Sequence, residues 1–239
     1  MFYNSRLLEN CSQKNLKSFK KQKKTAFTLA EVLITLGIIG IVAAMTLPTL
    51  LSRNDEKVAI NKLKKIYSVM SQAYLMSVND NGYANEWHVD NGFSENTANQ
   101  LASYIVPYLK VLKDCGTGRG CLGYTKNVSK LNGIEHNTDY ESDNRYYKLI
   151  LADGSYIWLR AASGQYCKTD ERGYSDGCAR IFIDVNGPKG LNTAGIDIFT
   201  FVITPKGVFP SLSDDCRKSS DGWGCSSYIL THENMNYPY

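Results

Sequence analysis

Hydrophobic and polar positions divide the chain into three patterns, and the first is a long apolar run. Residues 32–52 contain no charged side chain, and at 1.5 Å per residue such a helix is about 31 Å long. This length is enough to cross the hydrocarbon core of a membrane. The residues before the run are polar and rich in lysine, with KKQKK at positions 20–24. Basic residues stay on the cytoplasmic side, so the pattern predicts a single-pass protein with a cytoplasmic N-terminus.

The second pattern is helical and continues beyond the apolar run. Apolar side chains recur at spacings of three and four, which predicts an amphipathic helix; they are Val58, Leu63, Ile66, Tyr67, Met70, Ala73 and Tyr74. One helix is therefore predicted from about Thr28 to Val78, with Pro48 marking a bend or local melting. A second helix is predicted from about Thr97 to Lys113, although Pro107 removes a backbone donor inside it.

The third pattern begins near residue 146, where the period becomes two. Residues 147–151 and 155–159 read as a hairpin around an Asp153-Gly154 turn. Residues 180–185 and 197–204 read as two further strands, and the last segment as a short strand or loop. The predicted fold is α+β: a long N-terminal helix packed on an antiparallel meander of about four strands, with disulfide-stapled loops.

Glu31 is the anomaly in the apolar run. A charge in a membrane-length segment costs a few kcal/mol, so an intramembrane carboxylate points to a function and to a partner. An ordinary secretory signal peptide has a shorter apolar region that ends at a small-x-small site. Here the run is longer and Val42-Ala43-Ala44 matches that site imperfectly. A plain membrane anchor accounts for the length of the run but leaves Glu31 unexplained.

The segment from Lys20 to Leu51 resembles the processing and methylation signal of type IV prepilins, the family shared by type IV pilins and the pseudopilins of type II secretion and competence systems. The matching features are a basic leader ending at Ala26, then Phe27 as the first mature residue, Thr28 and Leu29 behind it, Glu31 as the fifth mature residue, and Pro48 at the position where the family often has proline. Ala26 stands where the family usually has glycine.

This resemblance implies a processing route and a set of partners. A prepilin peptidase would cut between Ala26 and Phe27 and methylate the new amine of Phe27, and Glu31 would then meet the amine of a neighbouring subunit. Residues 1–26 would be a cytoplasmic leader that is removed, 27–51 a transmembrane and assembly helix, and 52–239 an extracytoplasmic pilin-like head. The implied partners are the peptidase, other pilin or pseudopilin subunits, and an inner-membrane assembly platform.

Charge and cysteine content support the same division. The whole chain has 27 basic and 23 acidic side chains; without the seven basic and one acidic side chains of residues 1–26, 20 and 22 remain, a net charge of −2. This near-neutral balance argues against nucleic acid as a general partner. Six cysteines remain after the leader, in three sequence-local couples that suit disulfides in an oxidising compartment; they are Cys115 with Cys121, Cys167 with Cys178, and Cys216 with Cys225. Six cysteines allow 15 connectivities, and no spacing here favours zinc.

A glycine-rich segment, residues 184–197, joins the last two predicted strands and concentrates oxygen donors of the type that calcium prefers. It is similar to the calcium-binding loop of major pseudopilins, and that resemblance implies Asp197 and the carbonyls of Leu191 and Asn192 as ligands, with Asp184 and Asn186 as alternatives. The competing interpretation is a connection in which Asp and Asn cap local backbone groups.

Two function classes follow from these observations. The first is a structural subunit of a type II secretion pseudopilus or a type IV pilus-like filament. The second is a minor pilin whose head binds a surface, a glycan or DNA. No sequence pattern of nucleophile and base is present, so enzymatic activity is not expected.

Overall fold

The computed structural model of the chain describes residues 27–123, 128–162, 167, 177–211 and 216–239. The chain divides into two compact units. One ends at Pro48, and the other spans Thr49–Tyr239. The expected leader, which ends at Ala26, lies outside the described residues.

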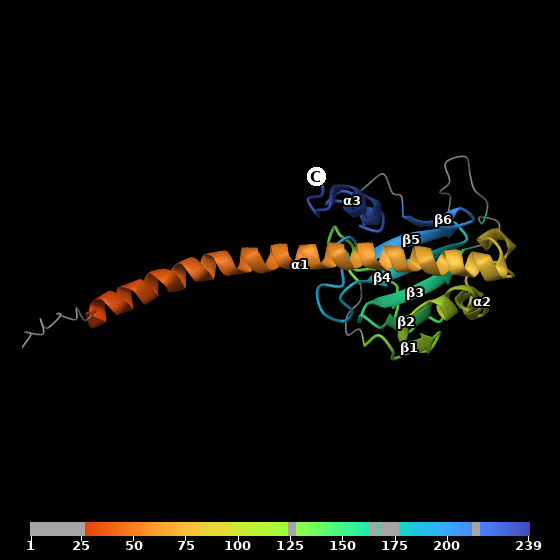
Figure 1. Cartoon of the computed structure of the whole chain (residues 1–239), viewed down its shortest axis with the longest axis horizontal. Helices are drawn as coiled ribbons and strands as arrows, with labels where there is room; N and C mark the ends of the chain where they lie inside the picture. The colour runs from red at the N-terminus through yellow and green to blue at the C-terminus, as the bar shows by residue number, and fades with distance from the viewer. Residues whose placement is uncertain (1–26, 124–127, 163–166, 168–176, 212–215) are drawn as a thin grey trace, which may run out of the picture. The chain divides into compact units, whose positions relative to one another are not determined.

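Helix α1 spans Leu29–Asn81 (Figure 1). It contains Pro48 and continues through it, so the local melting predicted at this residue is not observed, whereas the bend stays a prediction. The helix ends at Gly82, whose N–H donates to the carbonyl of Val78 at 3.0 Å. Gly82 has φ of 78°, the left-handed conformation that glycine adopts most readily after a helix.

Helix α2 is shorter than the sequence predicted. It spans Glu95–Ile105, a 3-10 turn follows at Val106–Tyr108, and strand β1 occupies Val111–Gly116. The prediction of helix up to Lys113 was therefore wrong. Pro107 explains the early end, because its ring has no N–H to continue the helical ladder.

Six strands form one antiparallel sheet in the order β1-β2-β3-β4-β5-β6. After β1 they are β2 (Tyr147–Leu151), β3 (Tyr156–Ala161), β4 (Ala179–Asp184), β5 (Ile198–Thr204) and β6 (Gly207–Pro210). The four predicted strands form its centre, and the predicted Asp-Gly hairpin joins β2 to β3. The sequence missed both edges, since β1 was assigned to a helix and β6 has only four residues.

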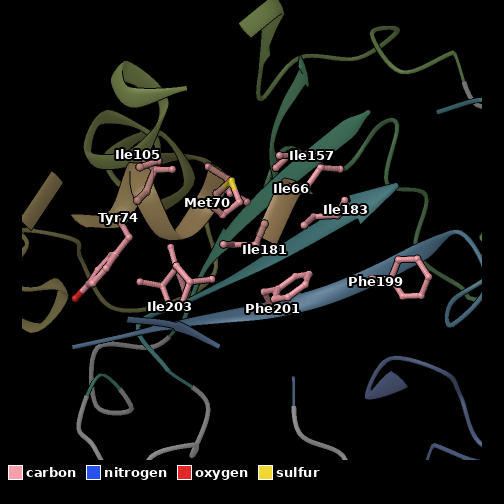
Figure 2. Packing of buried hydrophobic residues seen from close by; sticks show 14 of the residues in the cluster. Ile66, Met70, Tyr74, Ile105, Ile157, Ile181, Ile183, Phe199, Phe201 and Ile203 are labelled. Atoms are coloured by element: carbon pink, nitrogen blue, oxygen red, sulfur yellow. The ribbon is translucent and has the colours of Figure 1, made fainter. Parts of the chain in front are cut away.

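The main core lies between the sheet and the part of α1 that belongs to the head (Figure 2). Alternate strand residues such as Ile157, Ile181 and Phe201 point toward α1, which presents Ile66 and Met70. All five side chains are fully buried. The apolar side chains that recur every three or four residues in α1 therefore pack against those that alternate along the strands, as the two sequence patterns predicted.

The C-terminal segment is a helix rather than the predicted short strand or loop. Helix α3 spans Cys225–His232, and the tail after it returns to the head. Tyr237 is 5% exposed, and its hydroxyl donates to the carbonyl of Gly195. The backbone N–H of Met235 donates to the carboxylate of Glu56 at 2.6 Å. These contacts fix the tail on the head, whereas Tyr239 at the end is 91% exposed.

Candidate functional site

The first turn of α1 is closed by a reciprocal pair of hydrogen bonds. The backbone N–H of Thr28 donates to Oε2 of Glu31 at 2.8 Å, and the N–H of Glu31 donates to Oγ1 of Thr28 at 3.2 Å. This is the capping-box arrangement, in which two side chains satisfy backbone donors that the helix cannot. The Thr28 hydroxyl also donates to Oε2 at 2.8 Å. Glu31 therefore has a local structural role that its unusual position alone did not reveal.

The same helix has a surface suited to lipid. It contains a window of 18 residues with mean hydropathy 2.2, and none of that window is buried within the protein. Leu33, Ile38 and Met45 are among its exposed side chains, with exposed fractions of 61%, 58% and 74%. An apolar helix exposed all round is stable only when another apolar phase surrounds it. The length and composition of α1 are those of a membrane span.

The glycine-rich loop between β4 and β5 is organised around Asp197. Its Oδ2 accepts the N–H groups of Leu191 and Asn192, each at 3.0 Å, and its Oδ1 accepts that of Thr193 at 2.5 Å. The side-chain amide of Asn186 donates to Oδ2 at 3.4 Å. Asp197 is only 3% exposed, and this burial raises the pKa of its carboxyl, although the four N–H donors oppose the effect. The loop is thus folded around one carboxylate.

The remaining residues expected to bind calcium also have local hydrogen bonds. Oδ1 of Asp184 accepts the N–H groups of Asn186 and Gly187 at 3.0 and 2.8 Å. The carbonyl of Leu191 accepts the Thr193 hydroxyl at 3.3 Å, and the carbonyl of Asn192 accepts the N–H of Ser129 at 2.9 Å. These bonds match the competing interpretation, in which polar side chains cap local backbone groups.

Two side-chain oxygens of this loop accept no hydrogen bond from the described residues. The side-chain oxygens of Asn186 and Asn192 are buried and have no hydrogen-bond partner among the described residues. A buried acceptor without a donor is costly, and oxygens of this type are among the ligands that a hard cation takes. The oxygens of Asp197 fit less well, because backbone donors already occupy them. No group of three or more His, Cys, Asp or Glu side chains with metal-binding geometry occurs in the described part of the chain.

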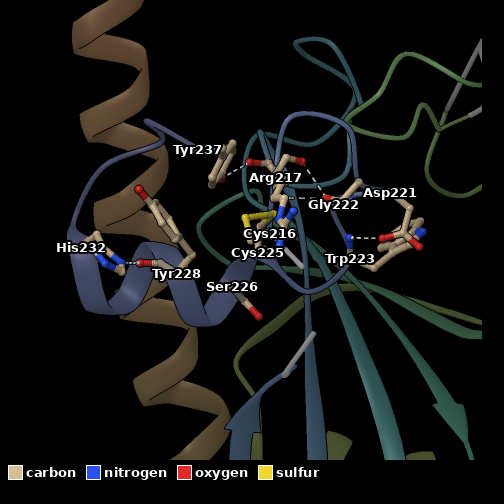
Figure 3. Close-up of a disulfide and its surroundings, with 12 residues drawn as sticks. Cys216, Arg217, Asp221, Gly222, Trp223, Cys225, Ser226, Tyr228, His232 and Tyr237 are labelled. Carbon is tan, nitrogen blue, oxygen red and sulfur yellow. Dashed lines mark hydrogen bonds between the residues drawn. A yellow bond between two sulfur atoms is a disulfide. The ribbon is translucent and has the colours of Figure 1, made fainter. Parts of the chain in front are cut away.

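Three disulfides join the sequence-local couples of cysteines: Cys115–Cys121, Cys167–Cys178 and Cys216–Cys225. The first closes the turn after β1. The third closes the loop before α3 and holds Trp223 and Asp221 on the other side of the disulfide from Tyr228 and His232 (Figure 3). Disulfides of this kind persist in an oxidising compartment.

A second layer of side chains covers the face of the sheet that points away from α1. Its buried residues include Trp158 of β3, Phe182 of β4, and Tyr140 and Tyr146 from the segment before β2. A cavity of about 360 Å³ opens over this layer. Aromatic or imidazole rings and three arginines contribute to its lining; these residues are His136, Tyr140, Tyr146, Phe182, Trp223, Arg145, Arg160 and Arg180.

Comparison with known families bears on the N-terminal segment. The model of the prokaryotic N-terminal methylation motif matches residues 21–47. The chain carries a prepilin-type cleavage and methylation signal. A family of unknown function (DUF6613) matches residues 49–118. No curated protein and no solved structure matches the chain.

The prepilin-type signal implies processing by a peptidase and assembly with other pilin subunits. Together with the apolar helix, it indicates a membrane-anchored pilin-like protein, and the α+β fold with one long helix and an antiparallel sheet is consistent with a type IV pilin-like fold. Proteins of this kind are typically structural rather than enzymatic.

The cavity on the head was not predicted from the sequence. Its residues come from segments between positions 136 and 224 that no single motif joins. One signal was present in the strands: Trp158 and Arg160 in β3, and Arg180 and Phe182 in β4, occupy alternate positions and so share the outer face. Large aromatic and cationic side chains on a face not covered by the long helix indicate a second packed layer with a charged rim.

Proposed function

We propose that the protein is a structural subunit, a pseudopilin or pilin-like protein, that assembles into a type II secretion pseudopilus or a type IV pilus-like filament used in protein export. The observation that carries the proposal is the coincidence of the prepilin-type signal with a membrane-length helix whose first turn holds a carboxylate. On this proposal the subunit sits in the inner membrane before assembly, with its N-terminus in the cytoplasm and its head outside. An inner-membrane platform would then receive it.

The geometry of Glu31 supports a contact between subunits. Cleavage before Phe27 leaves the N–H of Thr28 in place, so the capping box survives processing. The hydrogen bonds of the cap use Oε2, and no bond to Oε1 is present in the described residues. Glu31 therefore has one oxygen to cap its own helix and one to offer to the Phe27 amine of a neighbour.

This pairing also gives a route to a filament. In an apolar environment a carboxylate is stabilised in its ionised form by an opposite charge. Each processed subunit would present one ammonium group at Phe27 and one carboxylate at Glu31, one helical turn further along α1, and a staggered neighbour would pair with both. A head-to-tail contact of this kind that does not close on itself produces a helical filament.

Three substitutions separate capping from charge pairing. Glu31→Ala removes both the cap and the charge, Glu31→Gln retains an acceptor for the Thr28 N–H but removes the charge, and Thr28→Val removes the hydroxyl but keeps the carboxylate. We expect all three proteins to reach the membrane. Incorporation is measured in sheared or immunoprecipitated filaments. It should fall about tenfold or more for both Glu31 variants, because losing the charge pair weakens the contact between subunits by a few kcal/mol. It should stay near normal for Thr28→Val.

Two outcomes would overturn this mechanism. Normal incorporation of Glu31→Gln would show that no charge is needed, and loss of incorporation in Thr28→Val alone would assign the effect to the helix cap. Membrane fractionation of each variant is the matched control, because a protein that fails to insert cannot assemble.

A second function is a minor pilin whose head acts as a binding module for a surface, a glycan or DNA. The cavity of about 360 Å³ on the outer face of the sheet favours it, since small-molecule sites in proteins are concave and of about this size. A near-neutral mature chain favours a small ligand over DNA, whose binding depends on many cationic contacts.

Calcium binding by the 184–197 loop is a separate proposal, supported by the two buried amide oxygens of Asn186 and Asn192. Calcium would be held by these atoms with Asp197, and it would fix the loop between β4 and β5. Calorimetric titration of the full-length protein in detergent with calcium chloride tests it. Absence of binding heat, together with an unchanged melting temperature, would remove the proposal.

A further inference from the structure

The outer face of the sheet carries two arginines at neighbouring positions. Arg160 of β3 and Arg180 of β4 are directly paired in the antiparallel register, and both line the cavity. The cavity therefore has two guanidinium groups on neighbouring strands of one sheet face.

Among the residues that the structure describes, Arg160 is held in place by rings rather than by an acidic side chain. Its guanidinium carbon lies 4.6 Å from the centroid of the Phe93 ring, 5.8 Å from that of Tyr146 and 5.9 Å from that of Phe182. Such stacking orients a guanidinium plane while leaving its donors free in the plane. One donor makes a long bond of 3.5 Å to the Tyr146 hydroxyl. The buried Nε has no hydrogen-bond partner among the described residues.

The third arginine of the cavity behaves differently. Arg145 makes a paired contact with Asp143, with Nε 2.9 Å from Oδ1 and Nη2 2.6 Å from Oδ2. This contact neutralises Arg145 and holds the pKa of the Asp143 carboxyl below its usual value. Among the described residues, the ion pairs involve Arg145, Lys64 and Lys65 but not Arg160. Arg160 is thus an arginine of the cavity that no carboxylate of the described residues pairs with, and its guanidinium can serve an external anion.

The rest of the cavity is suited to a polar ring. The indole of Trp223 is half-buried, lies 5.5 Å from the rings of Phe182 and His136, and leaves part of its surface to the cavity. Hydroxyl-bearing Thr138, Thr200 and Ser211 also line the cavity, together with Gly224 and with Asp221, whose carboxylate accepts the N–H of Trp223 at 3.1 Å. An aromatic face beside hydroxyls and a guanidinium matches a sugar ring, which has an apolar face, several hydroxyls and, in acidic sugars, a carboxylate. The volume of the cavity lies near the lower end of the range for small-molecule sites, which suits a ligand with a single ring.

We propose that the cavity over the outer face of the sheet binds a monosaccharide that carries a carboxylate, such as a uronic acid. The Arg160 guanidinium binds the carboxylate through two parallel N–H donors. Trp223 packs against the apolar face of the ring. This is a ligand site on the head, and it does not depend on the assembly mechanism proposed for α1.

Binding is tested by titrating the full-length protein in detergent and following tryptophan fluorescence and calorimetric heat. The ligands are D-glucuronate, D-glucose as the neutral ring, acetate as the carboxylate without a ring, and glucose 6-phosphate as a ring with a different anion. We expect saturable binding of glucuronate. The affinity for glucose, acetate and glucose 6-phosphate should each be lower than that for glucuronate by about tenfold or more, because each of these ligands lacks one of the matched groups.

The variant Arg160→Gln should weaken glucuronate binding about tenfold or more and leave the weak binding of glucose unchanged. Lys206→Gln is the matched control, because it removes one positive charge from the exposed turn between β5 and β6, away from the cavity lining. Circular dichroism and melting temperature show that each variant is folded.

Several results would overturn the proposal. They are no binding of glucuronate, equal binding of glucose, equal binding of acetate, tighter binding of glucose 6-phosphate, or unchanged affinity in a folded Arg160→Gln protein. None of these results would affect the filament proposal, which is tested by incorporation of the Glu31 variants.

Discussion

At the scale of single residues, two carboxylates show how local chemistry determines a role. Glu31 caps the first turn of α1, and Asp197 gathers four N–H donors of the loop between β4 and β5. The sequence marked both as unusual, one by its apolar neighbours and one by its glycine-rich loop. It could not show their backbone partners, because those partners depend on how each turn closes.

His136 provides a prediction that depends on pH. It lies at the cavity, where burial, helped by Lys130 and opposed by Asp221, lowers its pKa below the ordinary value of 6.5. The unfolded chain therefore binds more protons than the folded chain just below that value. It follows that the free energy of unfolding should decrease as the pH falls through about 6.5.

Two measurements check this prediction. Histidine resonances followed by NMR should give a midpoint for His136 below 6.5, the value of an unperturbed histidine. Urea unfolding at pH 7.5 and pH 5.5, values about one unit either side of the ordinary pKa, should show a smaller difference in His136→Gln than in the unmodified protein. A midpoint at or above the ordinary value would contradict the prediction.

At the scale of elements, the sequence predicted the helices and strands that show a regular hydrophobic spacing. It missed the short elements whose conformation depends on their neighbours in the fold. The head part of α1 and the strands β2 to β5 were predicted because one spacing runs through each of them. Strand β1 was missed because Leu101, Tyr104, Ile105, Tyr108 and Leu112 continue a helical spacing after Pro107 has ended the helix. Helix α3 was missed because its eight residues are too few to show a period.

The disulfide before α3 gives a prediction for one element. Cys225 is fully buried at the first residue of α3 and bonded to Cys216, which is 8% exposed. The double variant Cys216→Ala, Cys225→Ala should lower the free energy of unfolding by about 2–4 kcal/mol, because the unfolded loop gains freedom and the core loses packing. Chemical denaturation monitored by circular dichroism measures the loss.

The pair Cys115–Cys121 is the comparison for that variant. Both of its cysteines are half-buried, Cys115 near the end of β1 and Cys121 in the turn after it, so removing this bond should cost less. Equal losses from the two double variants would show that packing around Cys225 contributes nothing beyond loop closure. An unchanged stability without Cys216–Cys225 would contradict the prediction outright.

At the scale of the whole molecule, the sequence predicted the architecture better than the candidate site on the head. A membrane-length run, an amphipathic stripe and several alternating strands each need a partner surface, and few arrangements satisfy all of them. The cavity is different, because Arg160, Arg180 and Trp223 lie far apart in the chain and meet only after the sheet and the Cys216–Cys225 loop have formed.

Processing is the prediction that concerns the whole chain. Protein purified from its native membrane should have an intact mass that begins at Phe27 and includes one methyl group on the amine. The same gene expressed without a prepilin peptidase should give the chain beginning at Met1, because the cleavage requires that enzyme. Retention of residues 1–26 in the presence of the peptidase would count against the prepilin-type interpretation.

The fixed C-terminal tail has a practical consequence for labelling the protein. Tyr237 and Met235 anchor the tail, while the ring of Tyr239 lies at the surface, 3.8 Å from the ammonium group of Lys218. A peptide tag added after residue 239 should leave the anchor intact and remain accessible to antibodies. A chain that ends before Tyr237 would lose the bond to Gly195 and release the tail, so epitope tags for following this protein are best added as extensions.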